Sequence, residues 1–181
     1  MDKPKHINTL HTNIRELILE ARSTVAKTVN FVSVVQNWEI GRMIVEEEQE
    51  GEAKAEYGKY IIKELSEKLT DEFGSGYSIQ HLKFCRQFYY IFPIGYALRS
   101  QLRITDSQDI KEMHTQLSQS KNSIAYALSN KTHPIYKILS PELSWTHYRS
   151  LLKVENLKAR EFYIKEAAEN DWGNSSIRPP D

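Results

Sequence analysis

The sequence has few of the features that mark secreted, membrane-spanning or disulfide-bonded proteins. It contains one cysteine, Cys85, among 181 residues, which excludes an internal disulfide. No apolar run approaches the roughly 18 residues that a membrane-spanning helix needs. The first ten residues, MDKPKHINTL, do not resemble a signal peptide. These absences predict a cytoplasmic protein with no membrane partner.

Motifs of catalysis and cofactor binding are also missing. The sequence has no glycine-rich phosphate loop, no Cys-x-x-Cys pair and no Gly-x-Ser-x-Gly motif. No two of its six histidines have the i, i+3 or i, i+4 spacing that would place two metal ligands on one helical face. The acidic run at residues 46–50 is interpreted as a solvated helix end. We therefore expect no catalytic residue, no metal site and no cofactor, and a function in binding rather than chemistry.

The whole chain has no net charge, but individual segments do. The 24 basic and 24 acidic residues cancel. Residues 1–72 carry 10 Lys or Arg against 14 Asp or Glu, and residues 142–181 carry six against seven. Residues 73–141 carry eight basic against three acidic residues. A polyanion such as DNA would therefore meet the middle of the chain.

Helical periodicity is the main pattern that is present, without strand alternation or internal repeats. From about residue 7 to 50, apolar residues recur every three or four positions, which predicts one long helix, or two with a break near Asn30 or Gly41. An apolar stripe predicts a second helix over about 56–73; it comprises Ile61, Leu65, Leu69 and Phe73. The predicted fold class is all-α.

Capping residues mark the later helices. Ser78 is placed to cap a helix that Pro93 ends, while Ser144 and Asn156 cap two helices reaching about residues 153 and 170. We divide the chain into an N-terminal helical arm, a helix-turn-helix, a variable and partly ordered connector, a short C-terminal helical subdomain and a tail. Their ranges are 1–52, 53–93, 94–140, 141–172 and 173–181.

The helix that follows Ser78 is the candidate nucleic-acid reader. No acidic residue occurs from Phe73 to Thr105. In a helix-turn-helix the first turns of the second helix reach base edges, while cations contact phosphates. The predicted DNA contacts are Ser78, Gln80, His81, Lys83, Arg86, Arg99 and Arg103. The alternative interpretation is the solvated face of a buried helix. Leu82, Cys85, Phe88, Tyr89 and Phe92 fall on one face of the predicted helix, and Cys85 is interpreted as a small core residue rather than a nucleophile.

The long N-terminal helix predicts a second function, in oligomerisation or partner binding. Its apolar stripe exceeds what the short helices of one chain can cover. The stripe includes Leu10, Ile14, Leu17, Ala21 and Val25. We expect a homo-oligomer formed through this helix, and a dimer would suit two-fold DNA sites.

Several phrases together resemble the N-terminal domain of the YhcG-type family over roughly residues 15–172. They are W-E-I-G-R at 38–42, I-V-E-E-E-Q at 44–49, A-E-Y-G-K at 55–59, R-Q-F-Y at 86–89 and L-S-W-T-H-Y at 143–148. The resemblance implies a DNA-binding module that precedes a PD-(D/E)xK nuclease domain in a longer chain. Because this chain lacks that nuclease domain, we expect it not to be an enzyme by itself.

A weaker likeness links the upstream helix-turn-helix and the L-S-x-x-H phrase to the DNA-binding core of ParB-type partition proteins. It implies that residues 143–153 support the reader helix rather than read bases.

Overall fold

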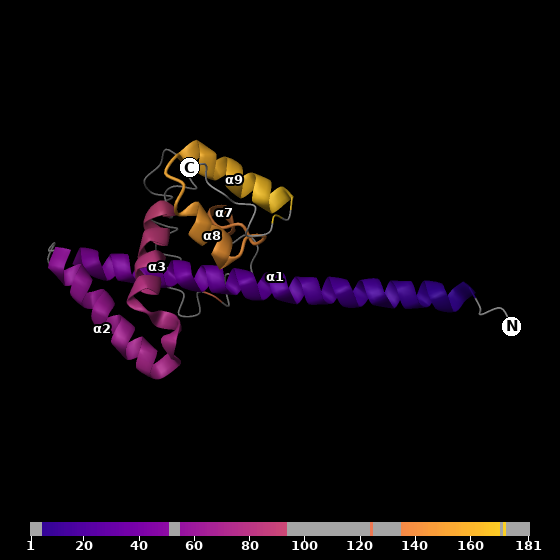
Figure 1. Ribbon diagram of the computed structural model, residues 1–181, viewed down its shortest axis with the longest axis horizontal. Helices are drawn as coiled ribbons and strands as arrows, with labels where there is room; N and C mark the ends of the chain where they lie inside the picture. Colours follow the sequence, from indigo (N-terminus) through magenta and orange to yellow (C-terminus); the bar gives the residue numbers. More distant parts are fainter. Residues whose placement is uncertain (1–4, 51–54, 94–123, 125–134, 171, 173–181) are drawn as a thin grey trace.

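The computed structural model describes residues 5–50, 55–93, 124, 135–170 and 172, and every regular element in these ranges is helical (Figure 1). The predicted all-α class is confirmed. The elements are α1 (Lys5–Glu50), α2 (Ala55–Phe73), a 3-10 turn η1 (Ser75–Tyr77), α3 (Ile79–Ile91), α7 (Ile135–Ile138), α8 (Trp145–Leu151) and α9 (Leu157–Glu169). Within the described residues, none of the helices has the length and apolar character needed to cross a bilayer.

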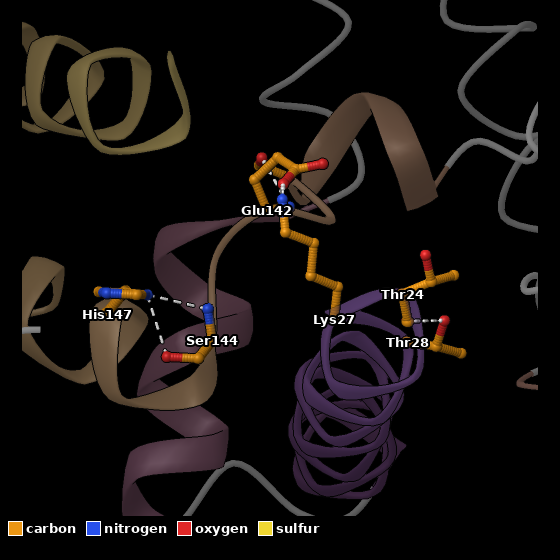
Figure 2. A network of polar contacts seen from close by, with 7 residues as sticks. Thr24, Lys27, Thr28, Glu142, Ser144 and His147 are labelled. Atoms are coloured by element: carbon orange, nitrogen blue, oxygen red, sulfur yellow. Dashed lines mark hydrogen bonds and ion pairs between the residues drawn. The ribbon is translucent and has the colours of Figure 1, made fainter. Parts of the chain in front are cut away.

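Helix α1 is one uninterrupted helix of 46 residues, so the single-helix alternative is confirmed. Its first half, residues 7–30, is exposed throughout and extends away from the other helices in Figure 1. We call these residues the arm. From Phe31 onward the helix is buried on one side by α3, α7 and α8. An ion pair marks the transition, because Lys27 Nζ lies 2.6 Å from Glu142 Oε2 in the loop before α8 (Figure 2).

Helix α3 crosses the buried half of α1 at close range. A Cβ atom at Gly41 would lie 2.0 Å from the carbonyl oxygen of Cys85, so only glycine permits this approach. Beside the crossing, Trp38 is fully buried, and its Nε1 donates to the carbonyl oxygen of Phe92 at 2.8 Å. Because Phe92 follows the last turn of α3, this bond ties the end of α3 to α1.

A buried ion pair flanks the crossing at Gly41. Arg42 donates from Nε to Glu39 at 2.8 Å and from Nη1 to Glu46 at 2.6 Å. The side chains of Arg42 and Glu39 are each only 7% exposed. Such a pair depends on both partners, because removing one leaves a charge without compensation in a poorly solvated place.

The helix ends follow the capping signals of the sequence. Gly74, at φ 86°, ends α2, and the Ser78 hydroxyl oxygen accepts from the amide of His81 at 3.3 Å. Asn156 Oδ1 accepts from the amide of Ala159 at 3.1 Å. At α8, the amide of Ser144 donates to Nδ1 of His147 at 3.0 Å (Figure 2). The predicted caps at Ser78, Ser144 and Asn156 are confirmed.

Aromatic rings join α3 to α8. The ring of Phe88 lies 4.9 Å from that of Tyr148 and 5.3 Å from that of Trp145, measured between centroids. The Tyr148 hydroxyl accepts from the amide of Ser140 at 2.8 Å, and full burial raises the pKa of this tyrosine. These ring contacts therefore hold α8 against α3. Most of the predicted connector, 94–140, lies outside the described residues.

Candidate nucleic-acid interface

The N-terminus of α3 stands at the surface, after the short turn that follows α2. Ser78 and Gln80 are both exposed. Although the Ser78 oxygen accepts a bond from the His81 amide, its hydroxyl proton remains available to an acceptor such as a phosphate oxygen. Gln80, in the first turn, carries both a donor and an acceptor, as adenine recognition requires.

One face of α3 is exposed along its whole length. Gln80, Lys83, Gln87 and Tyr90 recur at intervals of three or four residues, and all four are exposed. Within α3 no residue is acidic. The opposite face carries Leu82, Cys85 and Phe88, none of which has any solvent exposure. The predicted core face is therefore confirmed, and of the polar residues expected in other directions Gln80 and Lys83 lie on the exposed face.

His81 lies on the inner side of this helix rather than on the exposed face. Its Nε2 is 3.0 Å from Asn37 Oδ1 on α1 and 3.5 Å from the sulfur of Cys85. The rings of Tyr77 and Trp145 flank it edge-on. Burial, together with the nearby charge of Arg149, lowers the pKa of His81, so the ring is neutral at pH 7. Of the predicted contact residues, this one takes part in the packing of α3 on α1.

Cys85, beside His81, has the environment of a core residue. Its sulfur is fully buried, and burial raises the pKa of its thiol to about 12. A thiolate is therefore scarce at neutral pH, which makes this cysteine unreactive. Its assignment as a small core side chain is confirmed.

Arg86 is held by an acidic residue from α1. Its Nη1 donates to Glu48 Oε1 at 2.8 Å, and the Tyr90 hydroxyl approaches Glu48 Oε2 at 3.5 Å. The Arg86 side chain keeps 32% of its exposure. A phosphate contact by Arg86 would have to compete with this pair.

Arg149 is a cation that the sequence reasoning missed. It is exposed on α8, and its guanidinium carbon lies 4.9 Å above the ring of Phe84, a cation–π contact. Phe84 follows Lys83 on α3 and adjoins Gln80 and Gln87 on the helical surface. Arg149 therefore extends the exposed face of α3 toward α8. In the sequence, Arg149 directly follows the L-S-W-T-H-Y phrase at 143–148.

Two of the predicted contacts, Arg99 and Arg103, lie outside the described residues. The described part of the chain brings three predicted residues together on one exposed surface. They are Ser78, Gln80 and Lys83. In the same ranges no group of three His, Cys, Asp or Glu side chains has the arrangement of a metal site.

Comparison with known proteins fits the phrases quoted above. A family model described as the DUF1016 N-terminal domain matches residues 13–179. The chain belongs to this family. A protein of Escherichia coli (strain K12) named "Putative nuclease YhcG" is 32% identical over 167 residues, which cover 90% of this chain and 41% of that protein. The chain thus spans less than half the length of the curated relative that it matches, and no solved structure gives a significant match.

Within this DUF1016 N-terminal domain, the W-E-I-G-R phrase has a structural role. Its Trp38, Gly41 and Arg42 form the hydrogen bond to α3, the close crossing and the buried ion pair. The phrase that helped to reveal the family therefore identifies the junction that positions α3.

Proposed function

We propose that this chain is a DNA-binding helix-turn-helix module, non-catalytic by itself, that in a longer protein directs a C-terminal nuclease domain to DNA. The observation that carries the proposal is the exposed, acid-free face of α3, which begins directly after a short turn from α2. A cytoplasmic location, suited to a chain with one buried and unreactive cysteine, belongs to the same proposal.

The exposed residues divide into two roles. Lys83 and Arg149 would contact phosphates, which supply most of the affinity and little of the specificity. Gln80 would read a base edge from the first turn of α3, because its amide can pair with adenine through two hydrogen bonds. His81 and Arg86, which the chain already engages, would position α3 instead.

Titration of labelled duplex DNA by fluorescence anisotropy at several salt concentrations tests the proposal. Affinity should fall linearly with the logarithm of salt concentration, by about 0.9 logarithmic units for each phosphate contact. Gln80→Ala should lose about 1–3 kcal/mol on a preferred sequence and little on others, whereas Lys83→Ala should weaken all sequences alike. A folded protein that binds no duplex at low salt would refute the proposal.

The arm supports a second candidate function, self-association. Its large apolar side chains are between 46% and 65% exposed. The solvent-facing surface of a helix is normally polar, so exposed apolar side chains along a helix indicate an interaction surface. They are Ile7, Leu10, Ile14, Leu17, Ile18, Leu19, Val25 and Val29. An isolated helix is marginal in water, and most helices in proteins are stabilised by packing. We therefore propose that a second copy covers the arm.

A further inference from the structure

One face of α1 follows an 11-residue repeat from the arm to the far end of the helix. Eleven residues complete three helical turns, so positions eleven apart lie on one face. Three interleaved series share this spacing. The series are Ile7, Ile18, Val29 and Ile40; Leu10, Ala21, Val32 and Met43; and Ile14, Val25, Gln36 and Glu47. Ten of the twelve residues are apolar. We call these twelve residues the repeat face.

Beyond the arm, the repeat face forms one wall of an open groove between α1 and α2. The groove has a volume of about 700 Å³. Ile40 and Met43 line it from α1, Ile61, Leu65 and Leu69 line it from α2, and Leu82 of α3 forms part of its floor. Met43, on the rim, is 61% exposed. The predicted stripe of α2 thus faces this groove, and its last member, Phe73, is also 61% exposed.

The core and the C-terminal helices lie on the other side of α1. The residues that α3 and α8 cover, such as Val34, Trp38 and Val45, are about half a turn around the helix from the repeat face. Lys27, which holds Glu142, also lies opposite Val25 and Val29. The described helices therefore leave the repeat face open to a partner along the arm.

We propose that two copies of the chain pair their repeat faces in an antiparallel arrangement, so that each arm lies along the groove of the other copy. The inference rests on the self-association proposed above and specifies its geometry. In a two-fold dimer the same face of both chains must be self-complementary. The repeat face meets this condition because the arm and the groove wall belong to it together.

Charge favours the antiparallel direction. Residues 5–30 of α1 carry four basic and two acidic residues, whereas residues 31–50 carry one basic and five acidic residues. Lys27 already pairs with Glu142, Glu39 and Glu46 pair with Arg42, and Glu48 pairs with Arg86. The long-range field of the two halves, rather than contact between these groups, therefore favours antiparallel pairing. Parallel pairing would place like charges together, which costs free energy.

The lengths also agree. With the two-fold axis near Val25 and Val29, Leu10 of one copy lies opposite Met43 of the other, because both are about 16 residues from the axis. The arm of the second copy would then pack as a third helix beside α1 and α2 and cover the groove. The small side chains of Ala21, Val25 and Val29 would let the two helices approach closely at the centre.

Cross-linking of variants that each carry one introduced cysteine tests this register. Leu10→Cys and Met43→Cys each place a thiol at an exposed site, while Cys85 is buried and unreactive. With a short bismaleimide, a mixture of the two variants should give a covalent dimer, and either variant alone should give little. In the antiparallel dimer, two copies of Leu10→Cys would hold their thiols roughly 50 Å apart, on a rise of 1.5 Å per residue.

A second pair of variants tests the two surfaces separately. Ile18→Glu in the arm and Met43→Glu in the groove should each raise the dimer Kd about tenfold or more in sedimentation equilibrium. Phe162→Glu, on an equally exposed apolar residue of α9, is the matched control and should leave the dimer Kd unchanged. Circular dichroism and thermal unfolding show whether each variant is folded.

The outcomes separate the inference from the self-association on which it rests. A wild-type protein that is monomeric at high micromolar concentration overturns both. A dimer in which each cysteine variant cross-links with itself, and the mixture gives no additional product, is parallel and overturns the inference alone. The same holds for a dimer that Ile18→Glu dissociates and a folded Met43→Glu leaves intact.

Discussion

The two halves of α1 share one continuous helix and differ in almost everything around it. In the arm, residues 7–30 are exposed, and the apolar side chains have no cover within the described chain. In the second half, Val34 and Trp38 have no exposure, and Gly41 admits the backbone of α3. Apolar residues therefore recur with the helical period in both halves, but the segments that cover them differ. The second half builds the core of one chain, and we propose that the arm builds the contact between two.

Arg42→Ala should show the largest effect in this comparison. The substitution leaves the Glu39 carboxylate, whose side chain is 7% exposed, without its cation, and we expect a loss of about 3–5 kcal/mol in the free energy of unfolding. Urea unfolding measures it. Lys68→Ala removes a cation from the exposed Lys68–Glu64 pair and should leave the free energy of unfolding nearly unchanged, because exposed ion pairs contribute little. Equal losses in both variants would contradict the account of the buried pair.

Gly41→Ala should come next. The added methyl group would meet the carbonyl oxygen of Cys85 at 2.0 Å, and because that atom belongs to the backbone, α3 would have to move. Overpacking of this kind costs about 3 kcal/mol. Gly76→Ala is the control, since a Cβ there meets no atom within 4 Å. A Gly41→Ala protein as stable as the control would show that the helices do not cross so closely.

His81→Gln should change the pH dependence of stability. Because burial lowers the pKa of His81 in the folded protein, the unfolded chain binds more protons as the pH falls through about 6.5. Stability should therefore decrease from pH 7 to pH 5, and the melting temperature of His81→Gln should decrease less than that of the wild type. Equal slopes in His81→Gln and the wild type would show that His81 does not contribute to the pH dependence.

The smallest effect is expected in the arm. Leu19 is 47% exposed and lies off the repeat face, so Leu19→Ala should change the free energy of unfolding by less than about 0.5 kcal/mol. The same substitution at the fully buried Leu151 should cost about 2–5 kcal/mol. Thermal unfolding of both variants measures the contrast. Similar losses would mean that Leu19 is buried in solution by contacts that the single chain does not contain.

The sequence predicted the parts of the fold that depend on local chemistry. At Ser78 and Asn156 a side-chain oxygen accepts from an amide three positions along, and at Ser144 the amide donates to the ring of His147, also three positions along. The buried face of α3 was predictable for a similar reason, because its apolar residues repeat with the helical period.

Contacts between distant segments were not predictable in the same way. His81 turns inward to Asn37, and Arg86 pairs with Glu48, residues that are 44 and 38 positions away in the sequence. Single-sequence reasoning treated both as polar residues available to DNA. The cation–π contact of Arg149 and the groove beside Met43 likewise depend on how helices far apart in sequence approach one another.

The central claim is that the exposed face of α3, extended by Arg149, contacts DNA phosphates. The most direct test is the salt dependence of duplex binding by the double variant Lys83→Ala, Arg149→Ala. Its control is Lys63→Ala, Lys165→Ala, which removes the same charge from exposed positions of α2 and α9. The account predicts that the salt slope falls by about two phosphate contacts in the first variant and remains unchanged in the control. Equal slopes in the folded double variant and the wild type would contradict it.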